Sequence, residues 1–174
     1  MSLAPEVDGT CDIIACLIDS TCGVMWYDSA AVVATEPDHV HTIVWPSITI
    51  LSGGQTYSPG VYCSPPGTFL LSATMTLTLN AKGDQKAEFT FIAASTFTSL
   101  PHTIVQLVNM ASAGNVYWSI GSSATIGDYS TMVGNIIATA SITFNSYSTL
   151  SGRGLAGAAI TCASGSKFVL ALQT

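Results

Sequence analysis

A sixteen-residue segment occurs twice near the C-terminal end of this sequence, and this repeat constrains the fold more than any other feature. Residues 129–144 read YSTMVGNIIATASITF, and residues 147–162 read YSTLSGRGLAGAAITC. Eight of the sixteen aligned residues are identical at an offset of 18 positions. Helical repeats need more than about 30 residues per unit, whereas 18 residues suit three short strands joined by corners. The repeat therefore predicts a β-solenoid with about 18 residues per coil.

The same offset predicts which side chains point into the solenoid. Segments 123–126 (SATI), 141–144 (SITF) and 159–162 (AITC) align with one another. Because side chains alternate along a strand, we expect the apolar parity to face inward and its neighbours to face outward. The inward rows are then Ala124, Ile142 and Ile160, and Ile126, Phe144 and Cys162; the outward rows are Ser123, Ser141 and Ala159, and Thr125, Thr143 and Thr161. With coils about 4.8 Å apart, the outward rows predict a flat grid of hydroxyl and methyl groups.

Other residues of the same period extend this interpretation. Gly134 and Gly152 are expected at a corner, where a residue that tolerates positive φ allows the strand to turn. Two further pairs are assigned to inward layers, Met132 with Leu150 and Ile137 with Leu155. Alternating segments upstream supply more outward hydroxyls, and we take as candidates to extend the grid Thr74, Thr76, Thr78, Thr90, Thr96 and Thr98.

Charge is scarce and unevenly distributed along the chain. Of the 174 residues, 48% are apolar and only 8% are charged, so one substantial core is expected beneath a surface of small and hydroxylated residues. Residues 1–45 hold seven acidic residues and no Lys or Arg, and the first basic residue is Lys82. This pattern excludes a basic surface for nucleic acid. No run of about 18 apolar residues is present that would span a membrane.

The acidic N-terminal part differs from the remainder and defines the expected organisation. Residues 46–174 are assigned to the solenoid, and residues 1–45 to a segment that caps its open end or docks a partner. Within that segment, Asp28 to Thr35 is expected to form a short helix that ends before Pro37. Residues 11–18 fit either a helix or a buried strand, since periodicity does not separate the two.

Cysteine and histidine patterns do not indicate a metal or catalytic site. Cys162 is assigned to the core by the repeat, and a disulfide is left open among the other four cysteines, Cys11, Cys16, Cys22 and Cys63. The spacing of the first three matches no zinc pattern, and His39 and His41 with one acid are interpreted as surface residues. Beyond residue 45 the acids are Asp84, Glu88 and Asp128, too few and too scattered for a polysaccharide-cleaving solenoid. We therefore expect no enzyme, cofactor or metal.

Several ordered motifs from residue 51 onward resemble a known family. They are LSGGQTYSPGVY at 51–62, LTLNAKGD at 77–84 with FTFI at 89–92, NVYWSIGSSAT at 115–125, GNIIA at 134–138 and SGRGLA at 151–156. They resemble the microbial ice-binding (antifreeze) protein-like domain family. The resemblance implies a right-handed, discontinuous β-solenoid with an α-helix packed alongside, and adsorption to ice as its activity. Residues 1–50 do not match the motifs with which that family begins.

Two functions from different classes follow from these observations. The first is adsorption to ice through the uncharged grid, because charged groups hold hydration shells that are costly to disrupt. The second is a structural or interaction protein, such as a cell-surface adhesin or a virion component, that binds a protein or glycan surface with the same rigid fold. The acidic segment favours this alternative, and so do the aromatic residues Trp26, Trp45, Tyr129 and Tyr147 if they lie on one surface. With no signal peptide visible, we expect a surface-exposed protein if an export signal was removed, and otherwise part of an intracellularly assembled particle.

Overall fold

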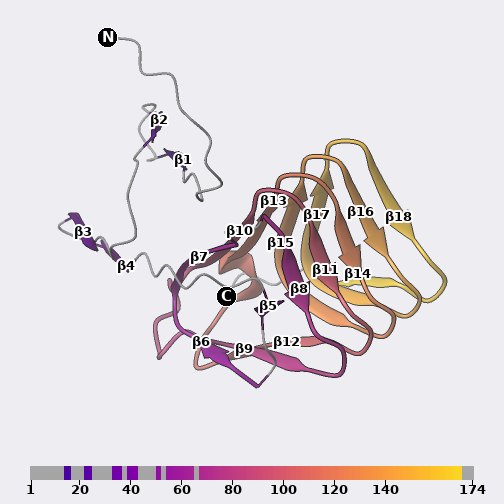
Figure 1. Ribbon diagram of the computed structural model, residues 1–174. Coiled ribbons are helices and arrows are strands. Elements are labelled where there is room, and N and C mark those ends of the chain that lie inside the picture. Colours follow the sequence, from indigo (N-terminus) through magenta and orange to yellow (C-terminus); the bar gives the residue numbers. More distant parts are fainter. Residues whose placement is uncertain are drawn as a thin grey trace, which may run out of the picture.

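Parallel strands stacked into curled sheets make up most of the chain in the computed structural model (Figure 1), which describes residues 14–16, 22–24, 33–36, 39–42, 50–51, 54–64 and 67–169. Two hairpins come first, β1 (Ile14–Cys16) with β2 (Cys22–Val24) and β3 (Val33–Glu36) with β4 (His39–Thr42), each antiparallel. The strands that follow form two larger, wholly parallel sheets. The mainly β, solenoid-like prediction is confirmed at this level.

The larger sheet has nine strands and bends into two faces. Its members are β6 (Thr56–Tyr57), β7 (Gly60–Ser64), β9 (Thr76–Asn80), β10 (Phe89–Ala93), β12 (Ile104–Val108), β13 (Val116–Ile120), β15 (Thr131–Ala138), β17 (Thr149–Ala156) and β19 (Lys167–Val169). β15 pairs with β12 through Thr131 and with β13 through residues 135–138, so one strand joins two rows of strands. We call the row containing β9 and β12 the β9 face, and the row containing β10 and β13 the β10 face.

A six-stranded sheet forms the third side of the coils. It consists of β5 (Ile50–Leu51), β8 (Phe69–Leu71), β11 (Phe97–Ser99), β14 (Ala124–Ile126), β16 (Ser141–Phe144) and β18 (Ala159–Cys162). The chain visits the β9 face, the β10 face and this sheet in turn, as Figure 1 shows for the orange and yellow coils. The only helix among the described residues is the 3-10 turn η1 (Ala113–Asn115).

The 18-residue spacing holds only in the last coils. The amide of Ser141 contacts the hydroxyl of Ser123, 18 positions earlier, and β15 pairs with β17 at the same offset along its whole length. Earlier coils are longer, since Thr103 contacts Ser130 across 27 positions and Ser99 contacts Gly127 across 28. The extra residues lie in segments 81–88 and 109–115, which connect the β9 face to the β10 face. The prediction of about 18 residues in every coil is therefore wrong for the earlier coils. Residues inserted at one corner lengthen those coils and leave the pairing of the strands intact.

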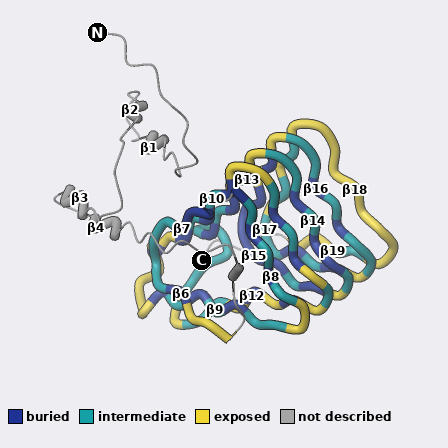
Figure 2. Tube along the Cα trace, in the orientation of Figure 1, coloured by how far each residue is buried: buried dark blue, intermediate teal, exposed yellow. Residues whose placement is uncertain are grey.

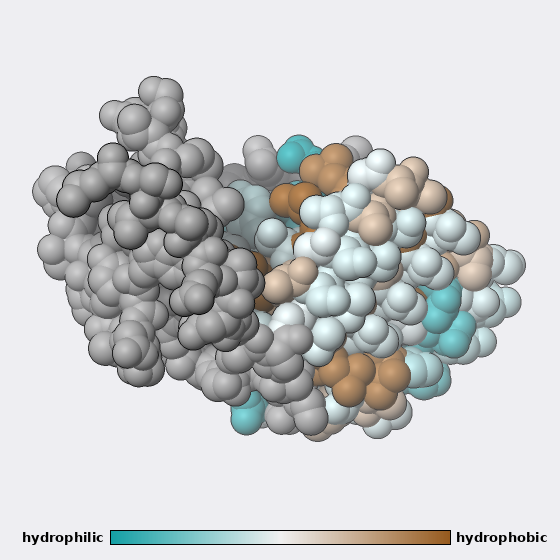
Figure 3. Space-filling view, turned by 45° about the horizontal axis from the view of Figure 1, so that its top comes forward, coloured by the Kyte–Doolittle hydropathy of each residue, from teal (hydrophilic) through white to brown (hydrophobic). Residues whose placement is uncertain are grey.

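Burial alternates along β14 and β16 as the sequence predicted, but every residue of β18 is exposed, including Ile160 at 45%; buried and exposed stretches can be followed coil by coil in Figure 2. Ala124, Ile126, Ile142 and Phe144 are all at most 1% exposed, while Thr125 and Thr143 between them are partly exposed. Outside the core, much of the described surface has the pale colours of weakly hydrophilic residues, with separate apolar patches (Figure 3).

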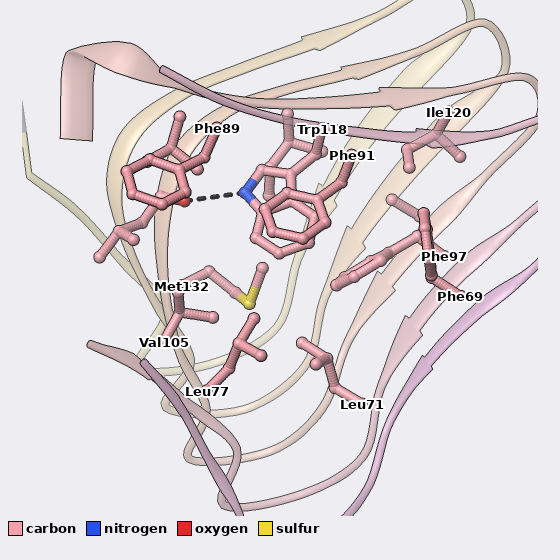
Figure 4. Packing of buried hydrophobic residues seen from close by; sticks show 14 of the residues in the cluster. Phe69, Leu71, Leu77, Phe89, Phe91, Phe97, Val105, Trp118, Ile120 and Met132 are labelled. Carbon is pink, nitrogen blue, oxygen red and sulfur yellow. Dashed lines mark hydrogen bonds between the residues drawn. The ribbon is translucent and has the colours of Figure 1, made fainter. Parts of the chain in front are cut away.

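Aromatic rings fill the interior of the early coils (Figure 4). Trp118 is fully buried and stacks on Phe91 with ring centroids 4.2 Å apart and an interplanar angle of 12°. Its indole Nε1–H donates to the backbone oxygen of Val133 at 2.9 Å, so the one polar group of the side chain is satisfied. These contacts join the β10 face to the corner that follows the β9 face and make the cross-section rigid.

Glycines at the corner within β15 and β17 permit a turn that other residues would obstruct. Gly134 has φ +103°, and a Cβ there would lie 2.6 Å from the backbone oxygen of Val116. Gly152 has φ +150°, and its Cβ would lie 2.0 Å from the backbone oxygen of Gly134. The predicted corner at these two positions is confirmed, and the absence of a Cβ lets successive coils approach each other closely.

Three local expectations are wrong. Ile137 and Leu155 point outward and are 41% and 55% exposed, because the turn at the preceding glycine shifts the parity of the second half of each strand. Cys162 is exposed with a free thiol, since β18 belongs to the last described coil and has only β16 as a neighbour among the described strands. The helix expected over 28–35 is contradicted at residues 33–35, which form part of β3, consistent with β-branched Val33; residues 28–32 lie outside the described residues.

Candidate functional site

Outward residues of the six-stranded sheet form two regular rows. Cross-strand pairing aligns Leu70 with Thr98, Thr98 with Thr125, Thr125 with Thr143, and Thr143 with Thr161. The second row contains Ser123 beside Ser141 and Ser141 beside Ala159, and Thr96 precedes it in β11's coil. We call this surface the threonine face; its residues are Leu70, Thr96, Thr98, Ser123, Thr125, Ser141, Thr143, Ala159 and Thr161. Neighbouring strands of a sheet lie about 4.8 Å apart, and outward residues of one strand about 6.7 Å apart, which sets the dimensions of the grid.

The threonine hydroxyls of this face are available to solvent. Within the described part of the chain, the side-chain hydroxyls of Thr98, Thr125, Thr143 and Thr161 have no hydrogen-bond partner in the protein. Ser123 differs, because its hydroxyl accepts a hydrogen bond from the Ser141 amide at 3.4 Å. The threonine row therefore presents methyl groups and hydroxyls that are free to donate to water and to accept from it.

No charged side chain lies on this face among residues 54–64 and 67–169. Four of the charged residues there belong to the segment between β9 and β10: Lys82, Asp84, Lys86 and Glu88. The others are Asp128 at a corner, Arg153 on the β10 face and Lys167 on the β9 face. Contact with this surface therefore requires no ionic group to lose its hydration shell.

Buried hydroxyls hold the corner at one end of the threonine face. Thr103, Ser130 and Ser148 are at most 1% exposed and occupy equivalent turns of successive coils. Thr103 donates to the oxygen of Leu100 at 2.6 Å, Ser130 donates to the same oxygen at 3.0 Å, and Ser148 donates to the oxygen of its own turn at 2.7 Å. These bonds satisfy carbonyl groups that the turn leaves without a strand partner, so the end of each strand is fixed.

The structure assembles only part of the candidate hydroxyl set. Thr96 and Thr98 join the rows of Ser123, Thr125, Ser141, Thr143, Ala159 and Thr161. The other candidates lie elsewhere: Thr76 and Thr78 belong to β9, Thr90 belongs to β10, and Thr74 occupies a corner with φ 58°. The idea that these four extend the same grid is wrong, because Thr76, Thr78 and Thr90 belong to the nine-stranded sheet and Thr74 to a turn between the two sheets.

Leu70 completes the threonine row and was missed by the sequence interpretation. It pairs directly with Thr98, and its side chain is partly exposed at the outward parity. The repeat at 18 positions does not reach it, since the offset between β8 and β11 includes the residues inserted after β9. The alternation of Phe69, Leu70 and Leu71 is also hidden, because all three residues are apolar.

Other kinds of site receive no support from the described residues. They contain no group of three or more His, Cys, Asp or Glu side chains placed to hold a metal ion. None of the helices in the described ranges is long and apolar enough to cross a membrane. Burial raises the pKa of the Tyr57 hydroxyl, and it raises the pKa of Tyr62 to about 12 with a smaller contribution from neighbouring Tyr57. Both tyrosines belong to the core of the first coil, outside the threonine face.

Two cysteines have described side chains, and they differ in their chemical state. Cys63 in β7 is disulfide-bonded, and Cys162, the other cysteine whose side chain is described, carries a free thiol. A link between Cys63 and the N-terminal trio was one of the alternatives left open by the sequence. Side chains of the N-terminal residues, including His39, His41, Trp26 and Trp45, fall outside the description.

Comparison with known proteins identifies a shared family pattern. The family model described as ice-binding-like matches residues 27–166. An ice-binding protein of Nostoc sp. (strain HG1) is 42% identical over 92 residues, which cover 52% of this chain and 32% of that protein.

Solved structures show the same arrangement. An ice-binding protein from an Antarctic biological consortium superimposes with a TM-score of 0.63 at 37% identity, covering 72% of this chain and 58% of the other. An ice-binding protein from the Antarctic ascomycete Antarctomyces psychrotrophicus gives a TM-score of 0.62 at 32% identity, covering 73% and 63%. The chain thus spans less than two thirds of the length of each of these relatives.

Proposed function

Because this chain belongs to the ice-binding-like family, we propose that it adsorbs to ice through its threonine face. The observation that supports this proposal most is the row Thr98, Thr125, Thr143 and Thr161, which is in register across four strands and has hydroxyls without protein partners. The proteins that resemble the chain are themselves described as ice-binding.

Adsorption to a crystal requires a surface that can order water over an extended area. Regular spacing along and across strands allows water bound at one threonine to hydrogen-bond with water at the next, while the methyl groups are weakly hydrated. Rigidity matters because a mobile side chain would lose entropy on binding, and threonine has a β-branched side chain with few rotamers. The buried row beneath, which includes Ile142 and Phe144, keeps the backbone of the face fixed.

The two other faces suit this role less well. The β10 face carries Arg153 and the partly exposed ring of Tyr117, and its exposed positions also include Ile137 and Leu155. The β9 face mixes exposed Ile104 and Gln106 with Lys167. Charge and uneven side-chain size on both faces would interrupt an ordered water layer, so the threonine face is the one we assign to ice.

Finer features of the fold follow from general rules and remain part of the proposal. Parallel strands joined within a sheet by a crossover connect with a right-handed sense in nearly all proteins, which supports right-handed winding of these coils. The disulfide at Cys63 supports attachment of the acidic segment 1–45 to the first coil, where it would cap the solenoid or dock a partner.

An oxidising, extracellular location fits both the ligand and the chemistry of the chain. Disulfides persist in secreted proteins and are rare where thiols are kept reduced, and Cys63 is disulfide-bonded. Growing ice outside a cell is also reached only by a protein that is exported. Tyr129 and Tyr147 are each 54% exposed and stack on each other with ring centroids 5.0 Å apart, but the relatives described above are named for ice binding and none for binding a partner, so we keep ice as the ligand.

Thermal hysteresis and inhibition of ice recrystallisation test the assignment. The test variant is Thr143→Tyr, which places a bulky ring at the centre of the threonine row. The matched control is Ser119→Tyr, at an exposed position of β13 on the β10 face. We expect the wild type and the control to shape ice crystals and slow their growth, and Thr143→Tyr to lose most of this activity. Freely growing, unshaped crystals with concentrated wild-type protein would refute the proposal.

A further inference from the structure

One corner of the coils repeats an unusual backbone conformation. Thr74, His102, Tyr129 and Tyr147 have φ values of 58°, 60°, 55° and 58°, and Gly165 follows with φ 77°. Hydrogen bonds between successive coils place them in one column: the His102 amide donates to Asp128, the Tyr129 amide to Ser146 and the Tyr147 amide to Ser164, at 2.9 to 3.0 Å. The left-handed region is favoured by glycine and is rare for residues with large side chains. Tyrosine at this position in two successive coils, Tyr129 and Tyr147, needs an explanation.

Ring stacking explains why aromatic residues occupy the column. The imidazole of His102 lies parallel to the ring of Tyr129, with centroids 5.1 Å apart and an interplanar angle of 3°. The rings of Tyr129 and Tyr147 follow at 5.0 Å and 10°. Gly165 ends the stack, since a Cβ there would lie 2.5 Å from the Tyr147 ring. Each ring therefore packs on its neighbours in the adjacent coils, and this contact compensates for the strained backbone.

The stack borders the threonine face directly. Tyr129 follows Thr125 by four residues and Tyr147 follows Thr143 by four, so each ring belongs to the turn that ends a strand of this face. Hydrogen bonds tie the turns together: the Asn145 amide donates to Ile126 at 2.9 Å, and the Ser146 amide donates to the Asp128 carboxylate at 3.1 Å. These bonds connect the turns that carry the rings to the ends of β14 and β16.

We propose that the stack of His102, Tyr129 and Tyr147 is a positioning element of the threonine face. Its spacing of 5.0 to 5.1 Å is close to the 4.7–4.9 Å that separates neighbouring strands, so the rings resist both compression and splaying of the coils. The rings set the separation of the threonine row along the edge where backbone hydrogen bonds give way to turns. This inference rests on the proposed ice adsorption, but the geometry it assigns to the rings does not.

Two double variants separate positioning from direct contact. Y129G/Y147G removes both rings and also removes the cost of positive φ, since glycine adopts this region freely. Y129F/Y147F keeps both rings and removes both hydroxyls. We expect the glycine variant to melt cooperatively near the wild-type temperature but to lose most of its thermal hysteresis, and the phenylalanine variant to keep it. The proposal would be overturned if the glycine variant kept the thermal hysteresis of the wild type. It would also be overturned if the phenylalanine variant lost as much hysteresis as the glycine variant, since that would indicate direct contact of the hydroxyls with ice.

A second measurement keeps this test independent of ice binding. Amide hydrogen exchange of β14 and β16 reports how firmly the coils are held at the edge of the threonine face. We expect faster exchange in Y129G/Y147G than in Y129F/Y147F, and unchanged exchange would overturn the positioning role even if the wild type showed no hysteresis. Absence of hysteresis in the wild type with faster exchange in the glycine variant would refute only the ice-binding proposal. If the double glycine variant does not fold, Tyr147→Gly alone, at the end of the stack, is compared with Tyr147→Phe by the same two measurements.

Discussion

Neighbouring residues of opposite parity offer a direct test of how the sequence builds the threonine face. Ile142 and Thr143 are adjacent in β16, yet Ile142 is fully buried while Thr143 is partly exposed in the outward row. We compare Ile142→Ala with Thr143→Ala. The first removes most of a buried side chain from an interior in which Phe144 and Ile126 pack in the next row, and the second removes a hydroxyl and a methyl group from the surface.

Burial sets the expected magnitude of each change. Truncation of a fully buried isoleucine to alanine costs about 2–5 kcal/mol, because transfer free energy is lost and a cavity remains. For a domain of this size, 1 kcal/mol shifts the melting temperature by about 2–4 °C, so Ile142→Ala should lower it by roughly 4–20 °C. Thr143→Ala should change stability by less than about 1 kcal/mol, the range expected for a surface position in a strand.

Denaturant unfolding followed by circular dichroism measures both variants under identical conditions. The predicted order is a large loss for Ile142→Ala and a small one for Thr143→Ala. Equal losses would contradict the assignment of the two rows, and a larger loss for Thr143→Ala would show that they are reversed. The assignment of the threonine face would then fail, because its hydroxyls would belong to the interior.

Three other predictions follow from the same structure. Gly134→Ala should destabilise the protein strongly, because the new Cβ would lie 2.6 Å from a backbone oxygen of β13. Gly54→Ala should lower the free energy of unfolding less, because a Cβ at that residue, with φ +75°, would have no atom within 4 Å. Paired denaturation curves compare the two variants. Burial raises the pKa of Tyr62 from its ordinary 10.0 to about 12. The protonated hydroxyl of the folded protein therefore contributes stability that is complete below pH 10 and is lost as the pH rises through about 12. Tyr62→Phe should abolish this pH-dependent loss in a series of unfolding curves. In the native protein a thiol reagent should label Cys162 and leave Cys63 unlabelled, as peptide mapping would show. Labelling of Cys63 without reductant would contradict the disulfide.

The solenoid and the direction of its side chains were predictable because three coils near the C-terminus share one period. Identical spacing in the sequence places Thr125, Thr143 and Thr161 in one row, and the pairing of β14, β16 and β18 confirms that row. Thr98 was only a candidate, since residues inserted between the β9 and β10 faces shift its offset from Thr125 away from 18. Pairing of β11 with β14 is a long-range contact that no local pattern encodes.

Two kinds of error show what a short repeat does not determine. Parity fails where a glycine turns the strand, as it does before Ile137, because the alternation restarts after the turn. The position of a residue along the series of coils also matters. Cys162 has the parity of a core residue but lies in the last described coil, and no further described strand covers it. The stack of His102, Tyr129 and Tyr147 was not predictable from the sequence, because it depends on a backbone conformation that those residue types rarely adopt.

Direct adsorption to a single ice crystal tests the central claim most plainly. The wild type and Thr143→Tyr, each labelled with a fluorophore on the amines of Lys82, Lys86 and Lys167, none of which lies on the threonine face, are offered to a slowly growing hemisphere of ice. Our account predicts fluorescence on defined crystal planes with the wild type and little incorporation of Thr143→Tyr, provided that both proteins show the same melting temperature. Equal incorporation of the two proteins, or exclusion of both from the ice, would contradict the assignment of ice binding to the threonine face.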